Sequence, residues 1–383
     1  MRAMVIGGGV AGATAALALR RIGAEVTVYE AYADPEGDVG AFVSLAANGL
    51  RCLDGLGALE AVRAAGHEIE RQRMWSAGGM LLGDVARGRR EADAVRSVTL
   101  MRGRLVAALR DRAAAAGARI VTGERLVSAT EAADGVTAAF EGGRAETADL
   151  LVAADGIWST VRGALNPGAP RPQYAGLYSV SGVSRLDGVE PGVFNLTFAR
   201  NGAFIHLAAG DEVWWSAQIQ APAEPDRRGA GDAEWLRRTA AAFAQEETPA
   251  RVIAAATGVH APVLMHVADP IPAWHGERIV LIGDAAHPVG AGQGASMAIE
   301  DALALAAGLQ RAGSVPAALL AYDAERRPRI AKVLGTAEDN RGAKKAGPVK
   351  RRLQAAMMRI FVPMFYEKAT AWLYAYEPAE LAK

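Results

Sequence analysis

The sequence predicts an α/β protein in which a parallel sheet with covering helices is interleaved with an antiparallel sheet. Residues 3–6 and 25–30 are short apolar strands on either side of an alanine- and leucine-rich helix, the pattern of a βαβ unit. A connection of that kind makes its two strands parallel. Buried-strand patterns return at 150–154 and 278–282. In residues 177–220, by contrast, apolar and polar residues alternate in short segments that turns separate, which is typical of antiparallel strands.

The remaining elements follow from the same periodicities. Further strands are expected at 119–123 and 126–130, followed by a hairpin over 136–147. Turn residues divide the alternating region into strands at 177–184, 193–199, 203–208 and 213–220. Apolar stripes or runs of alanine and leucine predict helices at 48–65, 100–116, 233–245 and 296–310. From residue 316 the pattern is helical throughout, with breaks expected at Pro328, Pro348 and Pro363 because proline removes a backbone donor.

Composition and charge exclude several classes of protein. The 42 basic and 42 acidic residues cancel, so charge gives no sign of a nucleic-acid partner. Cys52 is the single cysteine, which rules out a disulfide framework within the chain and suits a reducing compartment. The six histidines have no close metal spacing, so no metal site is expected. Met1 leads directly into a strand and no stretch of about 20 apolar residues is free of charge, so we expect a cytoplasmic protein without a signal peptide or integral membrane segment.

The turn after the first strand carries a glycine motif typical of dinucleotide-binding folds. Gly7 allows a tight turn, Gly9 lets a pyrophosphate approach the backbone, and Gly12 lets the helix lie close to the strand. Val10 and Ala11, between the last two glycines, open the helix whose free N–H groups and dipole favour phosphate. The alternative is an ordinary glycine-rich turn.

The second strand of this unit ends at Glu30, 18 residues after Gly12. A carboxylate at that place accepts hydrogen bonds from the ribose of a bound dinucleotide. An ordinary exposed acid is the alternative interpretation. The motif and the acid together predict dinucleotide binding, but they do not separate FAD from NAD.

Two later segments separate these cofactors. Residues 155–162 read Asp-Gly-Ile-Trp-Ser-Thr-Val-Arg after a buried strand, and residues 283–288 read Gly-Asp-Ala-Ala-His-Pro after another. The second segment continues through Gly-Gln-Gly at 292–294 into a helix. With the glycine motif, these segments resemble the FAD-dependent aromatic hydroxylases of the p-hydroxybenzoate hydroxylase type, the single-component flavoprotein monooxygenases. The three motifs occur in that family's order, and the resemblance covers nearly the whole chain, most weakly at 173–272.

The resemblance implies a Rossmann-type FAD-binding domain assembled from separated segments, an interleaved antiparallel-sheet domain that binds substrate, and C-terminal helices. The FAD-binding domain is expected to comprise residues 1–75, 98–172 and 273–330. The substrate domain is expected at 76–97 and 173–272, and the helical segment at 331–383.

The resemblance also assigns FAD contacts in the later motifs. Asp284 would hydrogen-bond the ribityl chain, since a carboxylate suits vicinal hydroxyls, and Arg102 would offset phosphate charge over the ribityl or pyrophosphate region. Backbone N–H groups from Gly292 through Gly294 to Ala295 would face the flavin pyrimidine. The helix that follows would stabilise negative charge on reduced flavin.

For other residues of these motifs, more than one interpretation stays open. Asp155 is implied to lie beside FAD and to take part in NAD(P)H docking, but both Asp155 and Asp284 also fit simple helix caps. Arg162 fits a surface ion pair equally well. His287 is expected to be a structural residue of its motif rather than a base, and no catalytic base is identified.

The implied activity is a monooxygenase reaction. NAD(P)H reduces FAD, reduced flavin reacts with O2, and the resulting flavin C4a-hydroperoxide hydroxylates or epoxidises a small aromatic or polyketide-like substrate. Residues 288–291 form a loop about two residues shorter than the family's, and Ala47 precedes Asn48 where proline is common. Two alternatives therefore stay open: a flavin oxidase or dehydrogenase that inserts no oxygen, and a flavin-bearing binding protein without turnover.

Polar and aromatic residues of the alternating region are candidate substrate contacts. They are Tyr178, His206, Trp215 and Gln218, with core packing as the alternative for each. The rings of Trp214 and Trp215 are expected on opposite faces of their strand. A monomer or homodimer is expected, and the apolar segment 353–376 is expected to pack on the domains, with a dimer or membrane-surface contact as alternatives.

Overall fold

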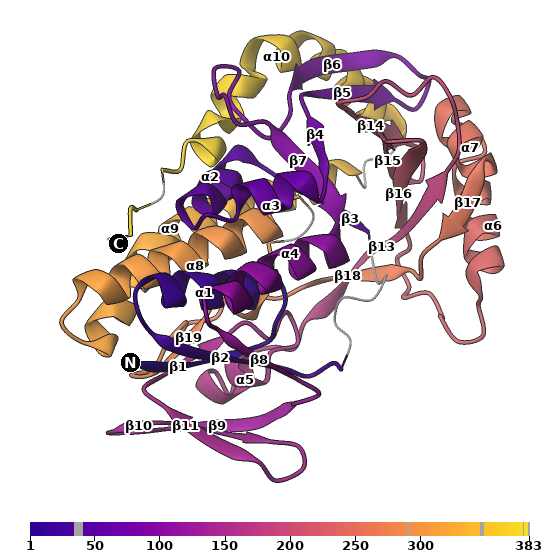
Figure 1. Cartoon of the computed structure of the whole chain (residues 1–383). Helices are drawn as coiled ribbons and strands as arrows, with labels where there is room; N and C mark the ends of the chain where they lie inside the picture. The colour runs from indigo at the N-terminus through magenta and orange to yellow at the C-terminus, as the bar shows by residue number, and fades with distance from the viewer. Residues whose placement is uncertain (34–40, 290–291, 345–347, 378, 382–383) are drawn as a thin grey trace.

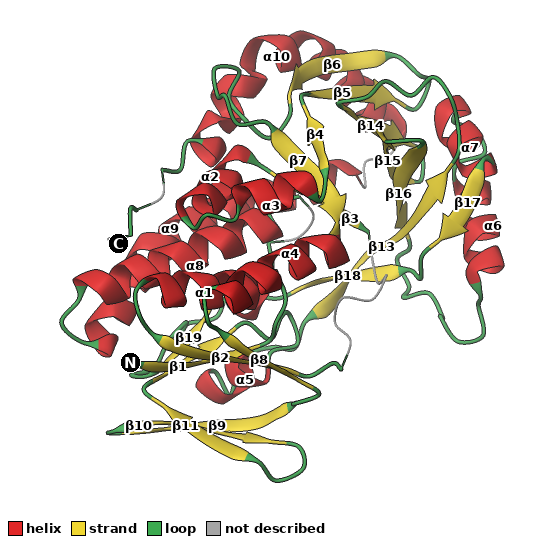
Figure 2. Cartoon of the chain, viewed as in Figure 1, coloured by secondary structure: helices red, strands yellow, loops and turns green. Residues whose placement is uncertain are grey.

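A five-stranded parallel sheet carries the N-terminal βαβ unit (Figures 1 and 2). The computed structural model describes residues 1–33, 41–289, 292–344, 348–377 and 379–381. The sheet has the order β19-β12-β1-β2-β8, and all its pairs are parallel. Its strands are β1 (Arg2–Ile6), β2 (Glu25–Glu30), β8 (Arg119–Thr122), β12 (Leu150–Ala153) and β19 (Ile279–Leu281). The α/β class and the parallel unit predicted from the sequence are confirmed.

Helices cover one face of this sheet. Helix α1 (Val10–Arg21) packs between α4 (Arg102–Ala115) and α8 (Gly294–Arg311), and its buried face is largely alanine and leucine, which allows close helix packing. The other face meets α5 (Thr160–Leu165) and a small antiparallel sheet (Figure 1). That sheet consists of β9 (Leu126–Ala132), β10 (Gly135–Phe140) and β11 (Ala145–Ala148), which includes the predicted hairpin.

A larger sheet forms the second unit. Its order is β17-β13-β16-β15-β14-β5-β6, with β18 also on β13, and the pairs are antiparallel except β14 with β5. The strands are β5 (Arg71–Ser76), β6 (Leu81–Ala86), β13 (Gln173–Ser184), β14 (Val193–Ala199), β15 (Gly202–Ala209), β16 (Glu212–Gln220), β17 (Ala256–Val259) and β18 (Val263–Val267). The predicted antiparallel region is confirmed.

The two faces of the large sheet meet different partners. One face is covered by α6 (Asp232–Ala242) and α7 (Glu247–Ala254), and this layer contains Trp215 and Trp235. The opposite face meets a sheet of β3 (Phe42–Leu45), β7 (Ser97–Met101) and β4 (His67–Ile69), where Trp214 stacks on Phe42. The two adjacent tryptophans thus lie on opposite faces, as predicted. Because β7 leads directly into α4, the second face is turned toward the parallel-sheet unit.

Several boundaries differ from those predicted. The helix expected at 48–65 is two helices, α2 (Ala47–Gly55) and α3 (Leu59–Ala64), because Gly57 adopts a left-handed φ of 67° between them. Residues 100–101 end strand β7, so the next helix begins at 102. Helix α7 was not predicted. Strand β5 pairs within the large sheet, so a division near residue 70 fits the pairing better than one at 75, and the domain division itself remains a proposal.

The C-terminal helices are longer than predicted. Helix α9 (Val315–Lys344) continues through Pro328, so the expected break there is wrong. Arg326 and Arg329, on either side of the proline, both bond to acids of α8, and these contacts hold the helix across it. Helix α10 (Pro348–Tyr374) likewise continues past residue 363 and lies along β6 (Figure 1). Among the described residues, every helix is too short or too polar to span a bilayer.

Candidate functional site

The turn between β1 and α1 shows why each glycine is needed. A Cβ on Gly7, whose φ is 96°, would lie 2.4 Å from the oxygen of Ala154, and one on Gly12 would lie 1.8 Å from the oxygen of Gly7. The protein itself therefore leaves no room for a side chain at these two positions. A Cβ on Gly9 would meet no atom of the described residues within 4 Å. The space above the helix start is open, as close approach of a ligand requires.

The backbone N–H groups in the first turn of α1 face this space as free hydrogen-bond donors. None of the described side chains caps the helix, whose N-cap residue is Gly9. The first N–H groups of a helix have no partner within it, so those that follow Gly9, at Val10, Ala11 and Gly12, remain available. An open, uncapped helix start fits the pyrophosphate of a dinucleotide.

Glu30 is buried at the end of β2 and is not an ordinary exposed acid. Its carboxylate accepts hydrogen bonds from Gly8 N at 2.7 Å and from Tyr32 N at 2.9 Å. Arg110 of α4 places its Nη2 3.6 Å from the same carboxylate and donates from Nε to the Gly8 oxygen at 2.7 Å. Arg110 thus fixes both the acid and the glycine turn. Sequence reasoning missed it because its role depends on α4 lying beside α1.

Asp155 and Arg162 join the two later motifs. Asp155 Oδ2 accepts hydrogen bonds from the N–H groups of Thr160 and Val161, so the residue does cap α5, and burial raises the pKa of its carboxyl. Arg162 is buried and donates to the carbonyl oxygens of Asp284 and Ala285 at 3.2 and 3.3 Å. The interpretation of Arg162 as a surface ion pair is therefore wrong. Its guanidinium ties the loop after β12 to the turn after β19.

Asp284 lies where that turn approaches the start of α8. Its Oδ1 is 3.7 Å from the position of a Cβ on Gly294, so these two residues are neighbours. The enclosing protein raises the pKa of its carboxyl, while His287, Arg102 and Arg162 act in the opposite direction. The side chain is nevertheless solvent-exposed, as is that of Arg102 at the start of α4. An accessible carboxylate and a nearby cation thus meet beside the first turn of α8.

The start of α8 is only partly described. Gly292 is exposed with a φ of 110°, and α8 begins at Gly294 with Ala295 next in its first turn. Residues 290–291 lie outside the described residues, so the short loop predicted at 288–291 is described only at Pro288 and Val289.

A buried ion network holds α8 in place. Asp301 Oδ2 accepts from His287 Nε2 at 2.6 Å, and its Oδ1 accepts from Arg326 Nε at 2.8 Å. Glu300 accepts from Arg326, Arg329 and Asn48, each at 2.7 Å. Glu300, Asp301 and Arg326 are completely buried. The network fixes α8 against α2, α9 and the turn after β19, which agrees with a structural role for His287.

The substrate candidates on the large sheet do not gather at one place. Tyr178, His206 and Trp215 lie on the face covered by α6 and α7. There Tyr178 packs edge-on to Trp235, Trp215 stacks on Phe204, and burial lowers the pKa of His206 to about 4. These three residues belong to the core of that layer, because strand alternation directs them away from the parallel-sheet unit.

Gln218 lies on the opposite face, the one turned toward the parallel-sheet unit. Ser216, two residues before it, shares hydroxyl hydrogen bonds with Ser179 at 2.8 Å and Ser181 at 3.2 Å on β13. Gln218 is paired in register with Ser179, so all four side chains share this face. The structure therefore separates Gln218 from the other three candidates.

Arg87 is a further polar residue of this face that the sequence did not reveal. Its guanidinium lies 3.9 Å from the ring centroid of Phe194 and donates to Gln72 Oε1 at 2.6 Å. Burial lowers its pKa, and its Nε has no partner among the described residues. Within that part of the chain, no carboxylate lies at ion-pair distance from it. Arg87 is half-buried, and only the fold shows that its Nε is enclosed by the protein.

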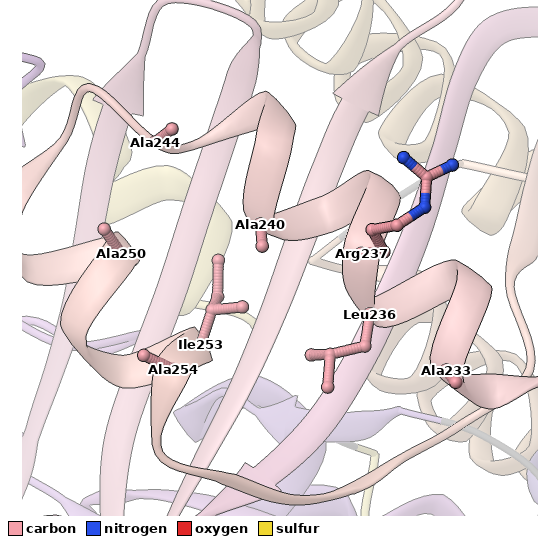
Figure 3. Close-up of a pocket in the computed structure, with 8 residues that line it drawn as sticks. All are labelled: Ala233, Leu236, Arg237, Ala240, Ala244, Ala250, Ile253 and Ala254. Atoms are coloured by element: carbon pink, nitrogen blue, oxygen red, sulfur yellow. The ribbon is translucent and has the colours of Figure 1, made fainter.

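A pocket lies elsewhere in the structure. It has a volume of about 490 Å³ and lies on α6 and α7, lined mainly by alanine with Leu236, Ile253 and Arg237 (Figure 3). These helices cover the face of the large sheet that is turned away from Asp284. Among the described residues, no group of three or more His, Cys, Asp or Glu side chains is placed to hold a metal ion.

Comparison with known sequences agrees with this geometry. A family model described as FAD binding domain matches residues 1–337. Aurachin C monooxygenase/isomerase of Stigmatella aurantiaca is 32% identical, over 84% of this chain and 84% of its own length. The 3-amino-4-hydroxybenzoate 2-monooxygenase PtnB3 of Streptomyces platensis is 34% identical, over 87% of this chain and 85% of its own length.

Solved structures share the fold over almost the whole chain. HpxO of Klebsiella pneumoniae, crystallised with FAD and uric acid, has a TM-score of 0.87 and 23% identity, and the match covers 98% of this chain and 97% of that one. A salicylate hydroxylase substrate complex has a TM-score of 0.79 and 24% identity, covering 98% and 96%. The chain belongs to the FAD binding domain family, and it is an FAD-dependent oxidoreductase of the monooxygenase and hydroxylase group.

Proposed function

We propose that the protein uses NAD(P)H and O2 to insert one oxygen atom into a small aromatic or polyketide-like substrate. The observation that carries the proposal is the meeting of the open glycine turn, the accessible Asp284 and the start of α8 around one site. The names of the two relatives support oxygen insertion rather than simple oxidation. We place the reaction in the cytoplasm. We expect the enzyme to be a monomer or a homodimer.

Different residues of the site bind different parts of FAD. Glu30 accepts the adenosine ribose, and the first turn of α1 after Gly9 donates to the pyrophosphate, with Arg102 offsetting phosphate charge. Asp284 accepts the ribityl hydroxyls, and backbone N–H groups at 292–295 face the flavin pyrimidine. Asp155, with the loop after β12, supports the cofactor and NAD(P)H docking. When bound, FAD supplies the two-electron chemistry that links NAD(P)H oxidation to oxygen activation.

The chain's own contribution to the reaction is electrostatic and positional. The 18-residue helix α8 directs its positive end at the site, which favours negative charge there. Glu300 and Asp301 lie two turns inside this helix and would oppose that effect if they were unpaired. Arg326 and Arg329 neutralise them, so the positive end of the helix is preserved while the helix is held rigidly.

We infer that the substrate lies against the face of the large sheet that carries Gln218 and Arg87. The hydroxyls around Ser216 and the amide of Gln218 suit polar ring substituents. Among the described residues the half-buried guanidinium of Arg87 has no carboxylate partner, and enclosing a charge is costly unless a ligand supplies the anion. Arg87 therefore favours an aromatic acid, the class to which the substrate named for the Streptomyces relative belongs.

An Arg87→Met variant is expected to weaken binding of aromatic acids. Loss of a charge-assisted hydrogen bond costs about 1.5–3 kcal/mol, which corresponds to about 10- to 100-fold in Kd. The measurement is a titration with 3-amino-4-hydroxybenzoate followed by the flavin spectrum, beside its uncharged methyl ester. Arg73→Met, on the other face of the same sheet, is the matched control and should leave both Kd values unchanged. Equal losses for acid and ester would remove Arg87 from the substrate site.

Labelled oxygen tests the proposed reaction itself. Under anaerobic conditions, NAD(P)H with substrate should bleach the visible flavin band of the purified protein. Admission of ¹⁸O2 should then return the band and place one labelled atom in the product, measured by mass spectrometry. An oxidised product without label would instead identify an oxidase or dehydrogenase. Absence of NAD(P)H consumption across a broad panel of aromatic substrates would favour a binding protein.

A further inference from the structure

Helix α10 packs on the face of the large sheet that carries Arg87. A Cβ on Gly83 of β6 would lie 2.4 Å from a methyl group of Val362 and 3.2 Å from Met74 Cε, so the helix and the sheet are in close contact there. Met74 comes two residues after Gln72, the hydrogen-bond partner of Arg87, and strand alternation places both on one face of β5. The helix, which Figure 1 shows beside β6, therefore covers part of this face.

Two tyrosines of α10 meet Arg87 on that face. Tyr366 follows Val362 by one helical turn, which places it on the side of the helix that meets β6. Tyr374, the last residue of the helix, is only 4% exposed. Both phenols interact electrostatically with the guanidinium of Arg87, and a hydrogen bond joins the two tyrosine side chains. Arg87, Tyr366 and Tyr374 thus form one polar group, which we call the Arg87 cluster.

Bonds from other elements hold both tyrosines in position. Arg51 of α2 donates to the carbonyl oxygen of Tyr374 itself. At the other end of the cluster, the backbone N–H of Glu91 donates at 2.9 Å to the carboxylate of Glu367, the residue after Tyr366. The segment of α10 that carries the tyrosines is therefore fixed on both sides, and a ligand of the cluster meets groups that are already in place.

The Arg87 cluster borders the start of α8. Gly88, the residue after Arg87, accepts a hydrogen bond at its carbonyl oxygen from the N–H of Ala47 at 2.8 Å. The adjacent Ala46 donates from its backbone N–H to Ser296 Oγ, in the first turn of α8, at 3.2 Å. The cluster is thus connected through one short backbone segment to the helix start that we assign to the flavin.

The cluster offers hydrogen-bond donors and needs an acceptor. Two hydroxyls joined by one hydrogen bond leave one O–H free, and a guanidinium has donors only. Burial is the main cause that raises the pKa of Tyr374, so this hydroxyl stays protonated at neutral pH and remains a donor. A carboxylate has two oxygens that accept such bonds, and it also supplies the negative charge that Arg87 lacks.

We propose that Tyr366 and Tyr374 act with Arg87 to bind the carboxylate of an aromatic acid substrate, so that helix α10 selects the substrate. The inference rests on the proposed function and adds two specificity-determining residues to it. It also assigns substrate selection to a helix that lies beyond residues 1–337, the part of the chain that the family model matches.

Titration of the full-length, FAD-loaded protein with 3-amino-4-hydroxybenzoate and with benzoate, followed by the flavin spectrum, tests this assignment. Tyr366→Phe and Tyr374→Phe should each raise the Kd for the acids about tenfold or more, because a hydrogen bond to a charged group is lost. The Kd for the methyl esters should change less than about twofold, since the esters carry no charge. Combination of either change with Arg87→Met should be less than additive, as expected for groups that bind one anion.

Tyr376→Phe is the matched control. It removes a hydroxyl just beyond the same helix, but that hydroxyl donates to Glu325 at 3.0 Å and not to the Arg87 cluster. All Kd values should therefore stay at those of the native protein.

Three results would overturn the proposal. Native affinity for the acids in both phenylalanine variants, or equal losses for acid and ester, would make the tyrosines packing residues of α10. Binding of neither acid by the native protein would show that the cluster does not receive an aromatic carboxylate. Failure to incorporate ¹⁸O, by contrast, would contradict the proposed reaction alone, because the titration measures binding without turnover.

Discussion

A Gly9→Ala variant is expected to fold normally and to be purified with little FAD. The added Cβ meets no atom of the described residues within 4 Å, and Gly9 has a φ of −72°, which alanine adopts without strain. The same methyl group enters the space above α1 that we assign to the pyrophosphate. Overpacking of this size costs about 1–3 kcal/mol, or about 5- to 150-fold in the Kd for FAD. Titration of apoprotein with FAD measures the loss, and the melting temperature of the apoprotein should not change.

Two other glycines provide the comparison. Gly12→Ala should destabilise even the apoprotein, because its Cβ would lie 1.8 Å from the Gly7 oxygen. Gly163→Ala, in α5 with open space around it in the described structure, should leave both folding and FAD binding unchanged. Native FAD affinity in the Gly9→Ala variant would show that the pyrophosphate does not lie over the glycine turn.

An Arg326→Met variant is expected to be strongly destabilised. The change leaves Asp301 with His287 alone and Glu300 with Arg329 and Asn48, so two buried acids share one guanidinium, and breaking a buried ion network of this kind costs about 3–5 kcal/mol of unfolding free energy. Chemical denaturation followed by circular dichroism measures the loss. Arg237→Met removes an arginine that is 70% exposed beside Glu234, and it should leave the free energy of unfolding essentially unchanged, because an exposed ion pair contributes little.

The cost of Arg326→Met should depend on pH. Burial alone would raise the pKa of Asp301, but the charges of His287 and Arg326 hold it well below the usual range. A depressed carboxyl pKa contributes stability that is complete above its unfolded value, about 3.9, and is lost as pH falls below it. The difference between native and variant proteins should therefore be largest near neutrality and shrink in acid. A difference of less than about 1 kcal/mol at neutral pH would mean that the network is not essential to the fold.

The parts predicted correctly from sequence rest on local patterns. The glycine motif, the hairpin over 136–147 and the alternation of Trp214 and Trp215 each follow from neighbouring residues and backbone geometry. Alternation also places Gln218 and Trp215 on opposite faces of the sheet, but it does not tell which of the two faces is covered by helices. Helix α7 was missed, and its packing with α6 decides that Tyr178 and His206 are core residues.

The parts that sequence did not predict depend on distant contacts. Arg110 acts on Glu30 from 80 residues away, and Arg87 becomes half-buried only when Phe194 and Gln72 meet it across the sheet. Pro328 is accommodated because Arg326 and Arg329 reach acids on α8. Proline rules consider a helix alone, and here tertiary bonds outweigh the missing backbone donor.

The position of β19 and α8 has a consequence for biosynthesis. The site needs β1 from the first residues of the chain, but its other wall, β19 with α8, is encoded more than 270 residues later. A nascent chain therefore leaves the ribosome with the edge of β12 and one side of α1 uncovered until residue 311 has emerged. Contacts of such long sequence separation form slowly and expose apolar surface meanwhile. Cofactor capture is consequently a late event in folding, and a truncated chain that ends before α8 has no site to fill.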